Sequence, residues 1–319
     1  MTVATQADIV SLGEAMVEFN QTGEGDGRLY LQGFGGDTSN FAIAAARQGA
    51  RVAYLSALGD DPYGRLLRRL WDEEGVDHAD VHTNPDAFTA IYFVTHGETG
   101  HQFSFFRSGS AASRMNPAQL PRKRIESARV LHLSGISLAI SPAACDTAYA
   151  AIDIARQAGV KVSFDTNLRL KLWSIDRARA VMSDVIARSD LCLPSYDDVV
   201  AITGITDPDA LVDHCLRLGA KVVALKLGDQ GALIADDHQR HRIAPHPCRP
   251  LDATGAGDTF GGAFVHRWLQ GDDLAQAGQY AATAAALSTQ GYGAVAPIPS
   301  TTQVLDAIRA AHDGVQKHE

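Results

Sequence analysis

Two glycines and a carboxylate lie together at the start of a predicted helix, in the segment Asp252-Ala253-Thr254-Gly255-Ala256-Gly257-Asp258. Gly255 and Gly257 allow the backbone to turn tightly and to approach a ligand. Because the N–H groups of a first helical turn have no partners within the helix, the backbone of Gly255, Ala256 and Gly257 predicts an anion hole. Asp258 stands beside this hole, where a carboxylate can accept a proton from a hydroxyl that attacks a phosphoryl group. A capping carboxylate without a chemical role is the alternative.

A second candidate ligand site follows the apolar run Val222–Leu225, in the segment Lys226-Leu227-Gly228-Asp229. Ligands of open parallel sheets bind beyond the carboxyl ends of the strands. The position of this segment at a strand end therefore predicts contact with a ligand.

Several other patterns favour structural roles. One polar segment contains metal-capable side chains and predicts an exposed strand and loop rather than a zinc site: His238, His241, His246 and Cys248. Asp60-Asp61-Pro62 predicts a helix start. The sequence contains neither G-x-x-x-x-G-K-[ST] nor G-x-G-x-x-G, and neither H-E-x-x-H nor G-x-S-x-G. A phosphate group must therefore be held by an anion hole other than a P-loop.

Apolar runs rich in β-branched residues alternate with helical patterns from Ala128 onward. Continuous apolar strands separated by amphipathic helices are typical of a parallel sheet covered on both faces, so the sequence predicts an α/β fold. The predicted strands are Val130–Leu133, Val160–Phe164, Leu191–Leu193 and Val222–Leu225, and the predicted helices are Ala143–Gln157, Arg177–Ala187, Tyr196–Ile202, Gly257–Leu269 and Leu274–Gln290.

The first third of the chain follows a different pattern. A buried strand at Ile9–Leu12 and a helix at Ser39–Gln48 are accompanied by four strand-like segments: Ala15–Phe19, Arg28–Leu31, Thr89–Thr95 and Gln102–Phe106. The Gly-rich connections Gly23–Gly27 and Gly97–Gly100 suit hairpins rather than crossover helices. Two inserted hairpins are expected to pair as a small antiparallel sheet over one end of the main sheet, which is the geometry of a lid.

Length and composition indicate an ordinary globular protein of 319 residues and 34.0 kDa. The length suggests two domains, or one large α/β domain with a small appendage. The net charge is −9, which disfavours binding to nucleic acid. No apolar stretch is long enough to span a membrane, no export signal is recognisable, and the four cysteines form no C-x-x-C pair. We therefore expect a cytoplasmic protein with reduced thiols.

Two motifs together resemble the ribokinase-like family of sugar kinases. These are Gly255-Ala256-Gly257-Asp258 after Asp252 and Thr254, and Gly35-Gly36-Asp37-Thr38-Ser39-Asn40 near the start. The resemblance runs from Ile9 to about Pro299. It implies one kinase domain over residues 1–319, with a parallel-sheet core, helices on both faces and a β-sheet lid formed by segments near residues 15–32 and 88–108.

Within this family, further strings resemble the kinases that phosphorylate 2-keto-3-deoxygluconate. They are Gly33-Phe34-Gly35-Gly36-Asp37-Thr38, Phe105-Phe106-Arg107, Leu133-Ser134-Gly135-Ile136-Ser137 and Phe164-Asp165-Thr166-Asn167-Leu168-Arg169 with Leu172-Trp173. A guanidinium group suits a carboxylate, which neutral sugars lack, so Arg107 and Arg169 are expected to bind a sugar acid. Surface ion pairs are the alternative for both arginines.

The resemblance also implies roles for residues on the sugar side. Gly36 and Asn40 match positions that contact sugar hydroxyls, and Phe105 to Arg107 match a lid segment over the substrate. The family often has a tyrosine where Phe105 stands, so one substrate hydrogen bond is absent here. Tyr92 is a further sugar-contact candidate, with strand packing as its alternative.

On the nucleotide side, the resemblance implies contacts from a set of strand-end residues: Asn167, Ser195, Lys226, Gly228, Gly231, Gly255 and Gly257. Asp258 matches the catalytic base. Many members of the family have an Asn-x-x-Glu string that helps to arrange magnesium and water, whereas this chain has Ser195-Tyr196-Asp197-Asp198. Asp198 is the carboxylate expected near the metal, directly or through water. ATP and Mg²⁺ are the implied cofactors, and a monovalent cation is a further candidate.

These observations predict phosphoryl transfer from ATP to the terminal hydroxyl of a small sugar acid, 2-keto-3-deoxygluconate, to give its 6-phosphate. The alternatives are a kinase for fructose, ribose or a nucleoside and, from another class, a noncatalytic sensor of the sugar acid. A lid with an exposed sheet edge also predicts a homo-oligomer.

Overall fold

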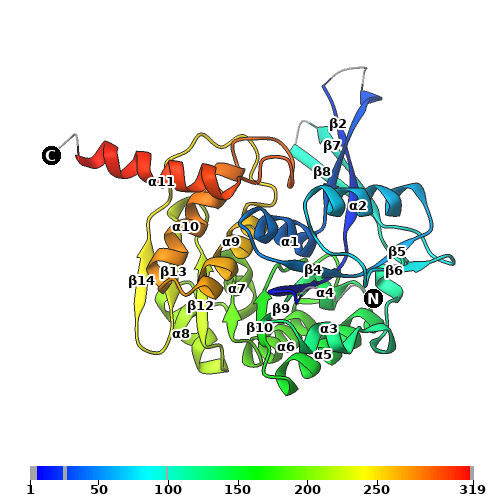
Figure 1. The fold of residues 1–319 in the computed structure, drawn as a ribbon, viewed down its shortest axis with the longest axis horizontal. Coiled ribbons are helices and arrows are strands. Elements are labelled where there is room, and N and C mark those ends of the chain that lie inside the picture. Colours follow the sequence, from blue (N-terminus) through cyan, green and yellow to red (C-terminus); the bar gives the residue numbers. More distant parts are fainter. Residues whose placement is uncertain (1–5, 24–26, 98–99, 317–319) are drawn as a thin grey trace.

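A twisted sheet of eight strands forms the centre of the protein. The structure is a computed structural model that describes residues 6–23, 27–97 and 100–316. The strands follow the order β14-β13-β12-β11-β10-β9-β1-β4 (Figure 1). Their bounds are β1 Ile9–Leu12, β4 Val52–Leu55, β9 Val130–Ser134, β10 Lys161–Asp165, β11 Leu191–Cys192, β12 Val222–Lys226, β13 Ala232–Ala235 and β14 Arg240–Ile243. All neighbours from β12 to β4 are parallel, which confirms the predicted α/β fold.

Two antiparallel strands extend this sheet beyond the last strand of the predicted parallel series. β13 pairs with β12 and β14 pairs with β13. The polar segment that was expected to be an exposed strand and loop contains β14, so that expectation is confirmed. β13 is a run of four buried apolar residues, too short to be distinguished by periodicity.

Helices cover both faces of the sheet. The apolar side chains of α1 Asp37–Arg47, α2 Pro62–Glu73, α9 Ala256–Gln270, α10 Leu274–Ser288 and α11 Thr301–Gln316 join one buried core. Those of α3 Arg122–Glu126, α4 Gly135–Ala139, α5 Pro142–Gln157, α6 Ile175–Ala187, α7 Tyr196–Thr203 and α8 Pro208–Leu218 join the other. Neighbours along a strand belong to opposite cores, as Ile9 and Val10 do in β1, because successive side chains of a strand point to opposite faces. The described residues also form three short 3₁₀ helices: η2 Ala112–Arg114, η3 Pro117–Gln119 and η4 Gly228–Gln230.

The helix starts follow from local side-chain chemistry. Asp61 accepts a hydrogen bond from the N–H of Gly64 at 2.7 Å and Pro62 opens α2, which confirms the helix start predicted there. Ser141 and Pro142 start α5 in the same way.

The lid is a second sheet, formed by β2 Met16–Gln21, β3 Tyr30–Gly35, β7 Ile91–Gly97 and β8 Gly100–Phe106 in the order β3-β2-β7-β8. Both predicted hairpins are present, and they extend above the main sheet (Figure 1). The expectation that the hairpins pair in an antiparallel manner was wrong, because β2 and β7 are parallel. Both of these strands leave the core in the same direction. The expected turns Gly23–Gly27 and Gly97–Gly100 lie partly outside the described residues.

A small two-stranded sheet lies beside the lid. β5 Ala57–Gly59 and β6 His82–Asn84 pair in parallel. Each strand has three residues, which is too short for a pattern of alternating burial to predict it.

Candidate active site

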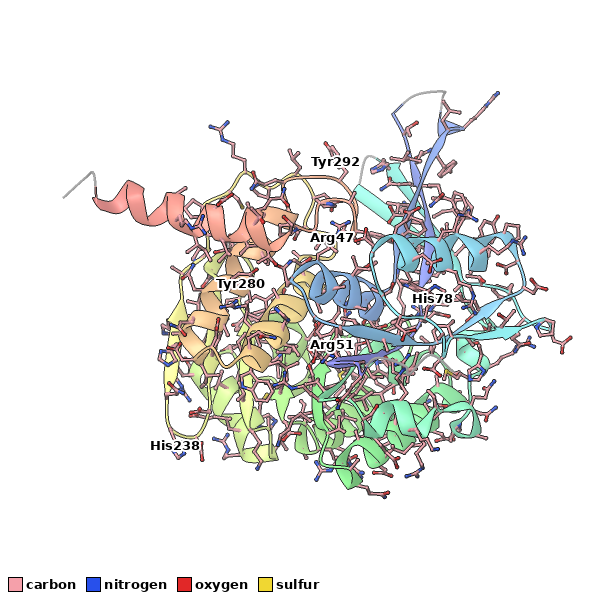
Figure 2. The ribbon with its side chains drawn as sticks, in the orientation of Figure 1. Arg47, Arg51, His78, His238, Tyr280 and Tyr292 are labelled. Atoms are coloured by element: carbon pink, nitrogen blue, oxygen red, sulfur yellow. The ribbon has the colours of Figure 1, made fainter. Side chains whose placement is uncertain are left out.

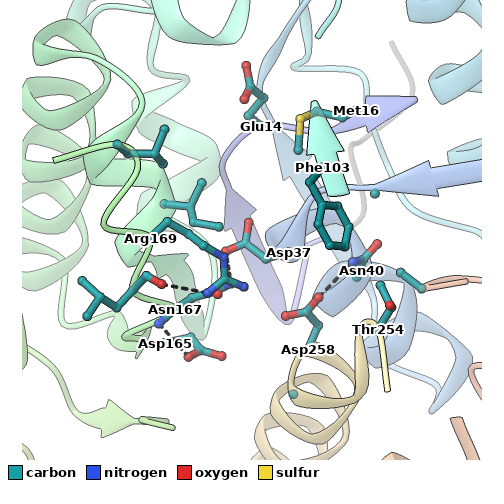
Figure 3. A pocket seen from close by; sticks show the side chains of 18 of the residues that line it. Glu14, Met16, Asp37, Asn40, Phe103, Asp165, Asn167, Arg169, Thr254 and Asp258 are labelled. Carbon is teal, nitrogen blue, oxygen red and sulfur yellow. Dashed lines mark hydrogen bonds between the residues drawn. The ribbon is translucent and has the colours of Figure 1, made fainter. Parts of the chain in front are cut away.

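A cleft of about 660 Å³ lies between the lid and the carboxyl ends of the parallel strands. The lid contributes Met16, Tyr92, Phe103, Phe105 and Arg107; the first turns of α1 and α9 contribute Gly36, Asp37, Asn40, Gly257 and Asp258; and the strand ends contribute Asp165, Ser195 and Lys226. Figure 3 shows these side chains converging on one space from opposite walls. Most of the predicted site residues are therefore brought together.

Close packing of α1 against α9 brings two of these residues into contact. Gly262 faces α1, and a Cβ there would lie 2.6 Å from the carbonyl oxygen of Phe41. The missing side chain allows the helices to approach, and in their first turns the Asn40 amide Nδ2 donates to Oδ2 of Asp258 at 2.9 Å. The Oδ1 atom of Asn40 is buried and has no hydrogen-bond partner among the described residues.

The carboxyl group of Asp258 has a pKa raised to about 8. Burial is the main cause, the negative charge of Asp37 is the second, and the hydrogen bond from Asn40 acts in the opposite direction. The side chain still reaches the cleft. A carboxyl group with this pKa holds its proton through neutral pH.

Backbone donors surround Asp258 at the start of α9. Gly255 caps the helix in the left-handed region with φ 76°, where a Cβ would lie 2.9 Å from the carbonyl oxygen of Ala294. The N–H groups of Gly255, Gly257 and Asp258 have no acceptor among the described residues. The N–H of Ala256 instead donates to the Ala253 carbonyl oxygen at 3.2 Å, and Ala256 does not line the cleft. The predicted contribution of Ala256 to an anion hole therefore has to be corrected, because the turn before the helix uses its donor.

An ion pair joins the ends of β12 and β10. The Lys226 ammonium lies 2.5 Å from Oδ2 of Asp165, and only 11% and 7% of the two side chains are exposed. Burial raises the pKa of Asp165 even though Lys226 favours its charged form. The ammonium also approaches α9, since a Cβ on Gly257 would lie 3.4 Å from it.

Asn167 connects the end of β10 to α1. Its amide Nδ2 donates to Oδ2 of Asp37 at 2.7 Å. Asn167 has φ 30°, and it is the one non-glycine with positive φ in the described part of the chain. Such a conformation costs about 1–3 kcal/mol and persists only where surrounding contacts hold it.

The predicted metal-side residue Asp198 holds the turn after β10. Its Oδ2 accepts hydrogen bonds from the Thr166 hydroxyl and the Leu168 N–H, both at 3.0 Å. Ser195 lies next to this turn, and its N–H donates to the Thr166 hydroxyl at 3.3 Å. Among the described residues, no group of three or more His, Cys, Asp or Glu side chains could hold a metal ion.

The two arginines expected to bind a sugar acid are in different situations. Arg107 pairs with the buried Glu14 carboxylate, at 2.8 Å from Nε, and Ser110 donates to the other oxygen of Glu14 at 2.5 Å. This buried ion pair already neutralises Arg107. Arg169 lies exposed at the cleft wall, donates to the Leu168 carbonyl oxygen at 2.8 Å, and makes no ion pair with a described residue.

Three aromatic residues of the lid line the cleft, namely Tyr92, Phe103 and Phe105. Tyr92 donates its hydroxyl proton to the buried Glu18 carboxylate, and its ring stacks on Phe105 with centroids 5.4 Å apart. Phe105 itself is 42% exposed. Because Tyr92 donates its proton to Glu18, only an acceptor lone pair of its oxygen is left for a ligand.

The chain matches the model of the pfkB family of carbohydrate kinases over residues 6–301. The chain belongs to the pfkB carbohydrate kinase family. It is 32% identical to fructokinase-1 of Oryza sativa subsp. japonica, across 95% of this chain and 98% of that protein. It is also 32% identical to a 2-dehydro-3-deoxygluconokinase of Thermoproteus tenax, across 95% and 94%. A crystal structure of a PfkB protein from Polaromonas sp. JS666 superposes with a TM-score of 0.86 at 31% identity, across 94% and 99%.

Membership of this family makes the protein an ATP-dependent sugar kinase and implies use of Mg²⁺. Fructokinases are more numerous among its relatives than 2-dehydro-3-deoxygluconokinases, so overall similarity does not determine the sugar. None of the helices in the described ranges is long and apolar enough to cross a membrane.

Two expected nucleotide contacts of this pfkB kinase lie outside the cleft. Gly228 and Gly231 shape the turn between β12 and β13, and neither lines the cleft. Sequence analysis also gave no role to several residues that line the cleft, among them Glu14, Asp37, Phe103 and Asp165. Asp37 stands inside the quoted Gly35 to Asn40 motif, and its place at a helix start beside two glycines was an available signal. Glu14 and Phe103 have no such signal.

Proposed function

We propose that this kinase transfers the γ-phosphoryl group of ATP to the terminal hydroxyl of a small sugar acid, and that 2-keto-3-deoxygluconate is that acid and becomes the 6-phosphate. The observation that carries the proposal is the arrangement at the start of α9. There a carboxyl group, an amide with an unpaired oxygen and free backbone donors face one cleft.

Asp258 acts as the base in this proposal. Its carboxylate accepts the proton of the substrate hydroxyl while the new O–P bond forms and the bond to ADP breaks. The N–H groups of Gly255, Gly257 and Asp258 would then stabilise negative charge on the transferring group, because they point from a helix start and have no other acceptor among the described residues.

The sugar would be held between α1 and the lid. The unpaired Oδ1 of Asn40 is an acceptor for a sugar hydroxyl, since a buried oxygen without a partner is costly. Gly36 lines the cleft beside Asn40, and the stacked rings of Tyr92 and Phe105 would cover the sugar. The lid would exclude water and so prevent hydrolysis of ATP.

Nucleotide phosphates are assigned to the opposite wall. Lys226, Asn167 and Ser195 lie at neighbouring strand ends there. Mg²⁺, when bound, neutralises phosphate charge. The residues present fit an ion that enters with the nucleotide, because Asp198 offers one carboxylate and no group of three or more His, Cys, Asp or Glu side chains in the described residues is arranged to hold a metal ion. We also propose that a monovalent cation binds this kinase, and the family resemblance is the sole support for that ion.

Arg169 supports the choice of an acidic sugar. Its guanidinium is exposed at the cleft without an ion-pair partner among the described residues, so a substrate carboxylate can bind it. Arg107 no longer supports this choice, because Glu14 neutralises it. A neutral sugar such as fructose or ribose, or a nucleoside, is the second candidate, favoured by the numerous fructokinase relatives.

Two further features belong to the proposal. Exposed Leu31 and Phe106 lie on β3 and β8, the edge strands of the lid, which supports a homo-oligomer formed through the lid. The cytoplasm is the proposed location, supported by four cysteines that are all free thiols.

A substrate panel with and without Mg²⁺ tests the proposal. Purified protein and ATP are incubated with 2-keto-3-deoxygluconate, fructose, ribose and a nucleoside, and ADP is measured. The sugar acid should give the highest kcat/KM. A higher kcat/KM for fructose would contradict the sugar acid, and thermal stabilisation without ADP would indicate a sensor.

Arg169→Met tests the carboxylate contact. Loss of a charge-assisted hydrogen bond should raise KM for the sugar acid by about tenfold or more and leave KM for neutral sugars unchanged. Arg69→Met is the matched control, because Arg69 is exposed on α2, outside the cleft. An unchanged KM in Arg169→Met would remove this residue from sugar recognition.

A further inference from the structure

Asp37 and Asn40 occupy one face of the first turn of α1. They are three residues apart, a spacing that places two side chains on the same side of a helix. Asn40 donates to Asp258, and Asp37 lines the same cleft. Figure 3 shows Asp37 on the wall that faces Asp258. The helix therefore presents to Asp258 a hydrogen-bond donor and, one turn earlier, a negative charge.

The carboxylate of Asp37 is fixed in this place. Asn167 donates to it at 2.7 Å. Asn167 is itself held, since its N–H donates to Oδ1 of Asp165 at 3.3 Å while its backbone keeps φ 30°. Because its own backbone is held in this strained conformation, Asn167 fixes the position of the Asp37 carboxylate.

The charge of Asp37 is also not neutralised. Its partner Asn167 is a neutral amide, and Asp37 makes no ion pair with any described residue. The other carboxylate near Asp258, that of Asp165, is paired with Lys226 at 2.5 Å. Asp165 and Lys226 therefore largely offset each other at Asp258, whereas no ion pair within the described part of the chain offsets the charge of Asp37.

We propose that Asp37 is a positioning residue whose fixed carboxylate, without an ion-pair partner among the described residues, keeps Asp258 in its protonated form while the cleft is empty. This inference rests on the proposed function, in which Asp258 is the base. Before phosphoryl transfer Asp258 releases this proton to solvent, and its carboxylate then accepts the hydroxyl proton as the O–P bond forms and the bond to ADP breaks. An idle cleft therefore contains no base that could activate water.

The groups that face Asp258 come from four elements. They are Asp37 and Asn40 of α1, Asp165 of β10, Lys226 of β12 and Tyr92 of β7. After burial, the charge of Asp37 is the largest contribution that raises the pKa of Asp258, and that of Asp165 is smaller. This order agrees with the geometry, because of these two carboxylates Asp165 is paired with Lys226 and Asp37 is paired with no cation of the described residues.

The test is a titration of Asp258 in the unliganded, full-length protein. Aspartate labelled with ¹³C in its carboxyl group is followed by NMR against pH, and the signal missing from Asp258→Asn identifies Asp258. The variant Asp37→Asn removes the charge but keeps an oxygen that can accept from Asn167. The titration midpoint of Asp258 should fall from about 8 in the wild type by about one pH unit or more in this variant.

Asp176→Asn is the matched control, because Asp176 has 86% of its side chain exposed outside the cleft and loses the same charge. Asp37→Ser is a second uncharged variant in case the asparagine disturbs α1. The acid limb of kcat/KM should move to lower pH in the same variants. An Asp258 midpoint that is equal in the wild type and in both Asp37 variants would overturn the inference.

Failure of this inference can be distinguished from failure of the proposed function. If Asp258→Asn is inactive and the Asp37 variants leave the midpoint unchanged, the base is retained and the role of Asp37 is rejected. If Asp258→Asn keeps its turnover, the base is rejected, and with it the role of Asp37, whatever the midpoint.

Discussion

The chemistry of this kinase depends at the residue scale on how charge is balanced around Asp258. Four aspartates line the cleft, Asp37, Asp165, Asp198 and Asp258, and the ammonium of Lys226 is already paired with Asp165. Burial adds to this repulsion and raises the pKa of Asp258 to about 8. The arrangement keeps a carboxyl group neutral where a proton acceptor is needed, and it makes stability depend on pH.

Asp258→Asn should therefore stabilise the protein at high pH. The pKa of Asp258 is raised in the folded state, from 3.8 to about 8, so its contribution to stability is fully present below pH 3.8 and is lost as the pH rises through 8. The asparagine side chain does not ionise, so the stability of the variant does not fall in this way as the pH rises. Thermal midpoints measured at pH 4 and pH 9 should show a gain for the variant that is larger at pH 9. An equal difference at both values would contradict the raised pKa.

Residues that act through local motifs could be predicted from the sequence, whereas residues that act through distant partners could not. Asp258 and Asn40 stand in glycine-rich motifs at helix starts, and the structure places them in contact. Arg107 was expected to bind substrate because a guanidinium suits a sugar carboxylate, but the structure pairs it with Glu14, which is 93 positions away in the chain. Nothing in the local sequence shows that pairing.

At the scale of elements, the site depends on a glycine, Gly36, that lets α1 start beside the lid. Gly36 caps α1 with φ 106°, and a Cβ there would collide with the backbone of Glu14 and Ala15, where β1 leads into the lid. α1 therefore begins against the connection between core and lid. This contact places Asp37 and Asn40 under the lid strands.

Gly36→Ala should consequently cost more stability than an alanine at another glycine with positive φ. Gly159 has φ 75° and nothing within 4 Å of a Cβ, so Gly159→Ala carries only the backbone cost of about 1 kcal/mol. Gly36→Ala adds the collision and should lower kcat/KM as well. Urea unfolding and kinetic measurements on both variants check this. Equal losses of free energy of unfolding would show that crowding at Gly36 is unimportant.

The elements that sequence patterns predicted are those with long apolar signals. The parallel strands β9, β10, β11 and β12 appear where continuous apolar runs predicted them. The parallel pairing of β2 with β7 was missed, because strand pairing depends on contacts between segments that are far apart in the chain. β6, the polar strand His82–Asn84, has no hydrophobic alternation that could predict it.

At the scale of the whole molecule, the lid and the core are joined at one buried cluster. Glu14 follows β1, whereas Arg107 and Ser110 follow β8, so two of the four connections between lid and core meet at the Glu14 carboxylate. Glu14 and Arg107 line the same cleft as Asn40 and Asp258. Most charged side chains instead cover the outer surface of the molecule (Figure 2). The fold therefore places the lid and the carboxyl group of Asp258 on opposite sides of one space.

The class of reaction could be predicted at this scale, but the sugar could not. The order of the two glycine motifs and the α/β alternation together predicted a sugar kinase, and the family match confirms it. The choice between an acidic and a neutral sugar depends on Arg169 and Arg107, which have similar positions in the sequence pattern but different partners in the structure.

The central claim, that Asp258 takes the proton of the sugar hydroxyl, is tested most directly by the turnover of Asp258→Asn. ADP formation is measured with saturating ATP, Mg²⁺ and the best sugar of the panel, after circular dichroism shows that the variant is folded. The account predicts a kcat lower than that of the wild type by about 10²–10⁴-fold, the contribution of a positioned base. A kcat within a few-fold of the wild type would contradict it.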